Sequence, residues 1–250
     1  MTDEKRNPVV EPETPPLVPP APPAPAELAA IEVLRTPHLR WYHLEDPASP
    51  SLDQLAQTFQ FHELEVEDCR HARQRAKIEE YENHIFVIGN TLHFMPETLG
   101  VWFGEIDIFV GSDFIVTVHM GPTRSVHDIL PRIQANPKLQ RPDKVFYALL
   151  DNIIDRYLPV LDAIGDRVDE LEDEVWANPT PKSLTDIFAL KRGLIEFRRT
   201  VSQMREMVNS FLRLRAPYNR AEMSAYWRDV YDHLVRAYER IDVYRDLLTG

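Results

Sequence analysis

The chain has 250 residues, enough for one large domain or two small ones with a sizeable buried core. Its formal net charge of −12 argues against a protein that binds duplex nucleic acid, because phosphate binding needs a basic surface, and it favours cations or basic partners. Cys69 is the single cysteine, so an intrachain disulfide is excluded and a reducing compartment is expected.

Hydropathy reveals no candidate membrane span. The longest apolar stretches, such as Ile85–Ile88 and Val145–Leu150, are far shorter than the roughly 20 residues that cross a bilayer. Asp3 and Glu4 stand where a signal peptide carries positive charge, and no apolar segment follows them. The sequence by itself therefore predicts a soluble, cytosolic chain.

Proline dominates the first 26 residues, which hold nine of the 21 prolines. Because proline interrupts both helices and sheets, residues 1–26 are predicted to be a disordered tail of polyproline character. Pro16 and Pro19 fit a PxxP pattern, but such a match is expected by chance in this composition and indicates no particular partner.

Residues 27–140 mix strand and short-helix patterns, which predicts an α/β domain. Ser51 is expected to cap a first short helix, and His62–Cys69 to form a second. A third helix, Val126–Gln134, closes the domain. Segments rich in β-branched and aromatic residues predict strands at Arg40–Leu44, Ile78–Tyr81, Ile85–Phe94, Val101–Val110 and Phe114–His119, with a hairpin turn at 111–113.

Residues 141–215 are predicted to form a long helical hairpin. Apolar residues recur at spacings of three and four over Phe146–Val175 and again over Ile187–Phe211. This pattern predicts two helices of about 30 residues, or roughly 45 Å each. Between them, Thr180 is expected to cap the second helix, with Pro181 in its first turn.

Residues 218–250 are predicted to form a third long helix, after a break at 216–219. The heptad spacing of the preceding helix, Ile187–Phe211, predicts coiled-coil packing against a neighbour. The apolar pattern of the third helix is still periodic at Gly250. A terminal glycine also suits a helix C-cap, but we favour a fragment whose helix continues.

Adjacent carboxylates, Glu67 and Asp68, end the second short helix and form the first candidate site. A basic cluster follows them, and this combination suits a hydrated hard cation or the charges of a partner. The basic residues are Arg70, Arg73, Arg75 and Lys77.

The long helices carry two further candidate clusters. On the third helix, Asp229, Asp232 and His233 share one face, either as a weak transition-metal site or as a polar stripe. On the first long helix, a run of acidic residues surrounds a lone Arg167. This run is interpreted either as a solvated helix face or as a diffuse reservoir for divalent ions. The acids are Asp162, Asp166, Asp169, Glu170, Glu172, Asp173 and Glu174.

Enzyme signatures are missing from the sequence. It contains no Walker loop, no G-x-S-x-G and no H-E-x-x-H motif. Glycine, at eight residues, is too scarce to favour phosphate-cradling loops. We therefore predict that the chain is not an enzyme.

Several motifs, in order along residues 40–250, resemble the cytoplasmic domain of CorA-type magnesium channels. They are Leu64-x-x-Glu67-Asp68, Gln74-Arg75-x-Lys77-x-Glu79-x-Tyr81-x-Asn83, Tyr147-x-Leu149-Leu150-Asp151, Asp166-x-Val168-Asp169-x-Leu171-Glu172-x-Glu174-Val175, Leu190-Lys191-Arg192-x-Leu194-x-x-x-Arg198-Arg199 and Arg228-Asp229-Val230-Tyr231-Asp232-His233. The resemblance implies an α/β fold with a mixed sheet flanked by short helices, then long antiparallel helices and a stalk helix that leads to a membrane domain absent from this chain.

The resemblance also implies a function and a set of site residues. Asp68 matches an interfacial metal-binding carboxylate, Asp229 its partner on a neighbouring subunit, Glu67 and Asp151 auxiliary acids, and His233 a stalk histidine. The expected role is metal sensing and gating in a homopentameric inner-membrane channel, with this region on the cytoplasmic side. The expected ion is Mg²⁺, with Co²⁺, Ni²⁺ and Zn²⁺ as other candidates.

Three alternatives remain open from the sequence. Cys69, His71 and His233 keep a zinc transporter of the same superfamily in consideration, because zinc prefers softer ligands. The long heptad helices also suit a soluble coiled-coil scaffold. A metallohydrolase is a third and more distant alternative.

Overall fold

The computed structural model describes residues 31–71, 74–120, 124–214 and 218–249. The predicted proline-rich tail, Arg73 of the basic cluster, residues 216–217 of the predicted break and the terminal Gly250 lie outside the described residues.

A six-stranded mixed sheet lies at the centre of the described chain, in the order β1-β2-β6-β5-β4-β3. The β2–β6 pair is parallel and every other neighbouring pair is antiparallel, which confirms the predicted α/β class with a mixed sheet. The strands are β1 (Glu32–Thr36), β2 (Leu39–Leu44), β3 (Lys77–Glu80), β4 (His84–Met95), β5 (Gly100–Gly111) and β6 (Phe114–His119).

The edge strand β1 was not predicted from the sequence. It pairs only with β2 among the described strands, and none of its five residues is fully buried. An edge strand without a buried face lacks the alternation that marks a strand in sequence. The turn between β5 and β6 was predicted, and a side chain at Gly111 would collide with the Phe114 ring at 2.1 Å, so glycine is required there.

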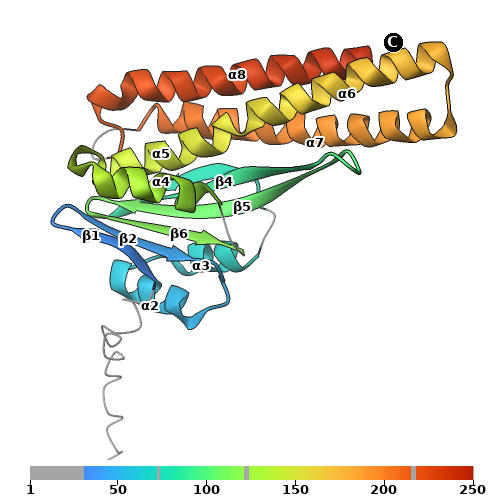
Figure 1. Cartoon of the computed structure of the whole chain (residues 1–250). Helices are drawn as coiled ribbons and strands as arrows, with labels where there is room; N and C mark the ends of the chain where they lie inside the picture. Colours follow the sequence, from blue (N-terminus) through green and yellow to red (C-terminus); the bar gives the residue numbers. More distant parts are fainter. Residues whose placement is uncertain (1–30, 72–73, 121–123, 215–217, 250) are drawn as a thin grey trace, which may run out of the picture.

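Helices cover both faces of the sheet (Figure 1). The two short helices α2 and α3 pack on one face, and α4, α5 and the long helices lie on the other. The helices are α2 (Pro50–Phe59), α3 (Glu63–Arg70), α4 (Arg124–Ala135), α5 (Pro142–Asp155), α6 (Tyr157–Ala177), α7 (Pro181–Phe211) and α8 (Ser224–Leu247), with 3₁₀ turns η1 (Pro137–Leu139) and η2 (Ala221–Met223).

Three predicted helix boundaries were wrong. Ser49, not Ser51, caps α2, and its hydroxyl accepts from the Ser51 N–H at 3.3 Å. The expected first rod is two helices, α5 and α6, which are separated at Arg156. The third long helix, α8, begins at Ser224 rather than at 218, because the turn η2 precedes it.

Two apolar clusters fill the spaces between the sheet and its helical layers. The smaller joins α2 and α3 to residues such as Phe86 and Phe109 of the sheet. The larger runs from Ile85 and Val87 through α5 to the long helices, where it includes Trp227 of α8. The long helices therefore share their hydrophobic core with the sheet.

The long helices α6, α7 and α8 lie side by side and alternate in direction (Figure 1). As predicted, Thr180 caps α7 and Pro181 starts it. Trp176, near the tip of the α6–α7 hairpin, is 90% exposed. Helices α6 and α8 approach closely at Gly165, where an added side chain would lie 2.4 Å from the Tyr244 hydroxyl.

Candidate functional site

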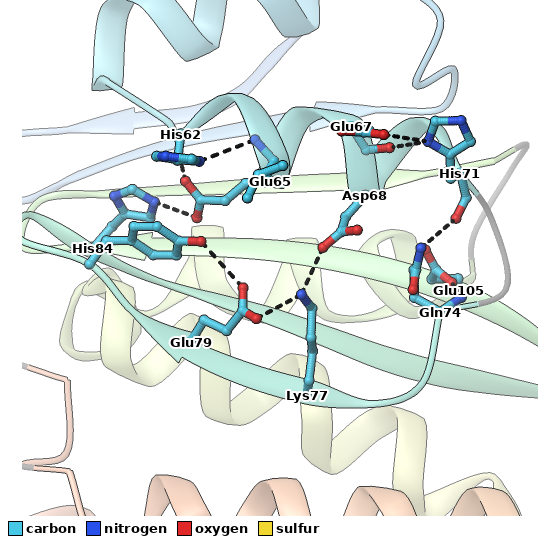
Figure 2. A network of polar contacts seen from close by, with 12 residues as sticks. His62, Glu65, Glu67, Asp68, His71, Gln74, Lys77, Glu79, His84 and Glu105 are labelled. Atoms are coloured by element: carbon cyan, nitrogen blue, oxygen red, sulfur yellow. Dashed lines mark hydrogen bonds and ion pairs between the residues drawn. The ribbon is translucent and has the colours of Figure 1, made fainter.

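Helix α3 presents the carboxylates Glu67 and Asp68, and a reciprocal cap at its start fixes its position (Figure 2). The His62 ring accepts from the Leu64 N–H at 3.2 Å, and Glu65 accepts from the His62 N–H at 2.6 Å. This exchange satisfies backbone donors that the first helical turn leaves unpaired. It defines where α3 begins, one turn before the candidate ligands.

A buried contact between a histidine and a glutamate anchors α3 to the sheet. His84 Nε2 on β4 lies 2.9 Å from Glu65 Oε1, and both side chains are buried. His84 Nδ1 faces the Asn83 Oδ1 at 2.6 Å, and the Asn83 amide donates to the Phe59 carbonyl at 3.0 Å. Both ring nitrogens thus lie within hydrogen-bond distance of side-chain oxygens, which hold the imidazole ring in place from two sides.

Asp68 lies at the surface of the chain, not in its core, since its side chain is 25% exposed. Its Oδ2 accepts from Lys77 Nζ on β3 at 2.7 Å, and the same ammonium donates to Glu79 Oε1 at 2.8 Å (Figure 2). Burial lowers the pKa of Lys77, but the hydrogen bonds to Asp68 and Glu79 outweigh burial and place it above its usual value.

Glu67 is more exposed than Asp68 and lies close to His71. Its carboxylate Oε1 is 4.0 Å from the His71 Nδ1, which also lies 2.9 Å from the Glu67 carbonyl oxygen. Adjacent helix positions point about 100° apart, so Glu67 and Asp68 face different neighbours. Both carboxylates remain within reach of a cation that approaches α3 from outside.

The second group of predicted ligands meets where α5 packs beside α8. Asp229 on α8 is 62% exposed, and its Oδ2 lies 3.6 Å from His233 Nε2. His233 Nδ1 lies 3.0 Å from Asp155 Oδ1 on α5. Asp155 was not among the predicted site residues, although it lies one helical turn after Asp151 and so shares its face.

Asp151 contributes a half-buried carboxyl group to this second group. Burial raises its pKa, and the Asp155 carboxylate raises it further. The Tyr147 hydroxyl donates to Asp151 Oδ1 at 3.1 Å. The pKa of Tyr147 is itself raised by burial and by the charges of Asp151 and Asp229. Asp151 and Asp155 lie one turn apart on α5. His233 contacts both Asp155 and Asp229, so the three carboxyl groups form one acidic patch.

The structure does not bring the two groups of ligands together within one chain. Helix α3, with Glu67 and Asp68, lies on one face of the sheet, and α8, with Asp229 and His233, lies beyond the other face (Figure 1). In the described ranges, no group of three or more His, Cys, Asp or Glu side chains is arranged to hold a metal ion. A site built from both groups therefore needs a second chain.

Behind α3, Cys69 and Asp107 form a buried pair that sequence reasoning did not identify. Burial and the neighbouring Asp107 raise the pKa of the Cys69 thiol, which therefore stays protonated at neutral pH. Burial also raises the pKa of Asp107 well above its usual range, and the charges of Glu105 and Asp68 add to that shift. Cys69 is consequently not presented as a soft metal ligand.

The acidic run on α6 is organised around Arg167. Its guanidinium donates to Glu170 at 2.8 Å, to Glu174 at 2.9 Å and to Asp186 of α7 at 2.9 Å. These contacts cross-link the hairpin and neutralise part of its acidic surface. They favour the interpretation of this run as a solvated, partly paired helix face over that of an ion reservoir.

Comparison with known proteins identifies the family. Residues 37–250 match the model of a family described as “CorA-like Mg2+ transporter protein”. The chain belongs to this family. Membership of the CorA-like family agrees with the prediction that the chain is not an enzyme, and it favours transport over the scaffold and hydrolase alternatives. Among the described residues, no helix is both long and apolar enough to cross a membrane.

Individual relatives support the same assignment. The chain is 31% identical to “Putative metal ion transporter YfjQ” of Bacillus subtilis, over 87% of this chain and 68% of the relative. It is 27% identical to the cobalt/magnesium transport protein CorA of Thermotoga maritima, over 80% of this chain and 58% of that protein. The soluble domain of CorA from Methanocaldococcus jannaschii shares the fold, with a TM-score of 0.75 at 19% identity over 85% of each chain.

Proposed function

We propose that this chain is the metal-sensing region of a divalent cation channel, in which Mg²⁺ bound between protomers keeps the pore closed. The observation that carries this proposal is the placement of Asp68 and Asp229. Asp229 is exposed and Asp68 is partly exposed, and they lie on opposite outer layers of one chain. Asp68 of one protomer can therefore share an ion only with Asp229 of another.

The chemistry of Mg²⁺ fits this arrangement. The ion prefers six oxygen ligands and keeps several of its waters, so a few carboxylates across an interface are sufficient. Glu67 extends the site from α3, while Asp151 and His233 extend it beside Asp229. When the ion leaves, the facing carboxylates repel one another, and the interface opens. Ion binding thus biases an equilibrium between closed and open assemblies.

The pore belongs, in this proposal, to a longer protein. The chain spans 68% of the YfjQ relative and 58% of the Thermotoga CorA, which leaves room in such proteins for a membrane domain. We expect five protomers to assemble around the pore, with this region in the cytoplasm beneath the inner membrane. Helix α8 then serves as the stalk that transmits changes at the interface to the pore.

Mg²⁺ is favoured over Zn²⁺ as the sensed ion. The only cysteine, Cys69, is buried with a protonated thiol, and the remaining exposed groups at the site are mainly carboxylates. Co²⁺ and Ni²⁺ remain candidate transported ions, since the Thermotoga relative is named for cobalt and magnesium. Competition between Mg²⁺ and Zn²⁺ in a transport assay distinguishes these ions.

Disulfide cross-linking tests the interface directly. We would express the full-length transporter as two variants, Asp68→Cys and Asp229→Cys, both in a Cys69→Ser background. The proposal expects a cross-link in the mixture of the two variants, and none in either variant alone. A chain carrying both cysteines that closes the disulfide within itself would contradict the proposal.

Protection from proteolysis tests gating. We expect Mg²⁺ to protect the assembled wild-type transporter, and the double variant Asp68→Asn/Asp229→Asn to lose this protection. Asp113→Asn, an exposed carboxylate in the β5–β6 turn, is the matched control. Undiminished protection of the double variant would show that these two carboxylates do not hold the closed state.

A further inference from the structure

Lys77 places a positive charge directly on the carboxylate that we assign to the interfacial ion. Its ammonium lies 2.7 Å from Asp68 Oδ2 and 2.8 Å from Glu79 Oε1, so two carboxylates hold it from opposite sides. It also lies 5.6 Å from the centre of the Phe86 ring, over its face. Lys77 and Asp68 are both about three-quarters buried, which limits screening by solvent.

We infer that Lys77 is a built-in competitor for the interfacial cation, one that sets the Mg²⁺ concentration at which the site fills. This inference rests on the proposed function, because it concerns the same Asp68 carboxylate. It adds a tethered cation, supplied by the chain itself, that must release Asp68 Oδ2 before a metal ion can take its place.

Simultaneous occupancy by both cations is unfavourable. An inner-sphere Mg²⁺ lies about 2.1 Å from its ligand oxygens, and Lys77 lies 2.7 Å from the same carboxylate oxygen. Two positive charges around one carboxylate repel strongly at such separations. Glu79 offers the displaced ammonium a second acceptor already in contact, so Lys77 has a place to remain when Asp68 is taken.

Other basic residues near α3 have different partners. Arg70 donates twice to Asp53, at 2.8 Å each, and His71 lies beside Glu67. Among the described residues, Lys77 is the one basic side chain in an ion pair with Asp68. The competing charge is therefore assigned to a single residue, which makes its removal informative.

The test replaces Lys77 by methionine, which keeps much of the aliphatic length and removes the charge. We would measure the Mg²⁺ concentration for half-maximal protease protection of the full-length transporter. An ion pair worth up to about 1 kcal/mol corresponds to about a fivefold change in affinity, so Lys77→Met is expected to lower that concentration about fivefold. Lys77→Arg keeps the charge and is expected to behave like the wild type.

Two controls make the result specific. Lys182→Met removes an exposed ammonium from a comparable pair with Asp186 on α7 and is expected to leave the Mg²⁺ requirement unchanged. In an Asp68→Asn background, the effect of Lys77→Met should disappear, because the contested carboxylate is gone. Thermal unfolding of each variant without Mg²⁺ verifies that it is folded.

The outcomes separate this inference from the proposed function. A lowered Mg²⁺ requirement in Lys77→Met that depends on Asp68 supports the competitor role. An unchanged or raised requirement, or an equal change in the Asp68→Asn background, overturns it while leaving the interfacial site intact. If Asp68→Asn alone has no effect on protection, the proposed function fails, and the inference fails with it.

Discussion

Asp107 is a carboxyl group buried behind the α3 carboxylates, and its proton is coupled to folding. Because burial raises its pKa, the folded chain holds this proton to higher pH than the unfolded chain does. Its contribution to stability is complete below the usual carboxyl pKa of about 4 and is lost as pH rises through the raised value. Ionised Asp107 therefore destabilises the fold at higher pH.

We predict that Asp107→Asn stabilises the chain at neutral pH. Asparagine mimics the neutral form of the side chain, so the gain should shrink as pH falls toward about 4, where the wild-type carboxyl is protonated too. Urea unfolding of both chains between neutral pH and about pH 4 measures this gain in stability. Asp113→Asn, at an exposed position, should show no comparable pH-dependent gain. A gain for Asp107→Asn that does not vary with pH would contradict this account.

A second prediction concerns the stability contributed by the buried Glu65–His84 pair. His84→Leu removes the partner of a buried carboxylate, and breaking such a pair costs about 3–5 kcal/mol. In the double variant Glu65→Gln/His84→Leu, an amide replaces the stranded charge and can still accept from the His62 N–H, so much of the loss should be recovered. Chemical denaturation of the wild type, the two single variants Glu65→Gln and His84→Leu, and the double variant gives the four unfolding free energies of a double-mutant cycle. No recovery would mean that packing, not charge, is lost.

At the scale of elements, the packing of α6 against α8 depends on Gly165. Alanine in a helix interior usually gains about 0.5–1 kcal/mol over glycine, but here its side chain would meet the Tyr244 hydroxyl at 2.4 Å. We predict that Gly165→Ala gives no gain in the wild type and the full gain in a Tyr244→Ala background. Thermal unfolding of the four chains measures this coupling, and equal effects in both backgrounds would contradict the close approach.

Element boundaries with local signals were predictable from the sequence, although one such signal was missed. Thr180 and Pro181 mark the start of α7. The Thr180 side chain accepts a hydrogen bond from a backbone N–H of the first turn, and the proline ring fixes a helical φ angle at the first position. The break between α5 and α6 also has a local signal, Pro159, which the regular apolar spacing concealed. Proline has no N–H to donate to the Asp155 carbonyl, so α5 ends at Asp155 and Pro159 lies in the first turn of α6. Arg156 between them keeps helix-like dihedrals, φ −73° and ψ −14°, so the apolar spacing continues almost unchanged through the break.

The candidate site was predictable only in part. Motif order placed Glu67, Asp68, Asp151, Asp229 and His233, but sequence spacing contains no information about contacts between elements. The Asp155–His233 contact joins residues 78 positions apart, and the Asp68–Lys77 pair joins a helix to a strand. The roles of Asp155 and Lys77 therefore emerged only from the folded structure.

At the scale of the whole molecule, the shared core predicts cooperative unfolding. The larger apolar cluster includes Ile85 of the sheet, Phe146 of α5 and Trp227 of α8. Residues 27–140 alone would expose the sheet face that these helices cover, so we expect this fragment to remain unfolded. Calorimetry of the whole chain should show one transition. Two well-separated transitions would instead support independent domains at the predicted boundaries.

The exposed tip of the α6–α7 hairpin has a practical consequence. Trp41 and Trp227 are fully buried, and Trp102 is 48% exposed and stacked on the His93 ring at 3.8 Å, whereas Trp176 is 90% exposed. Its indole should thus dominate the red edge of the emission spectrum and be the one most open to quenching by dissolved iodide. Trp176 is therefore an intrinsic fluorescent probe at the tip of the hairpin, and its emission can report movements of that tip without an attached dye.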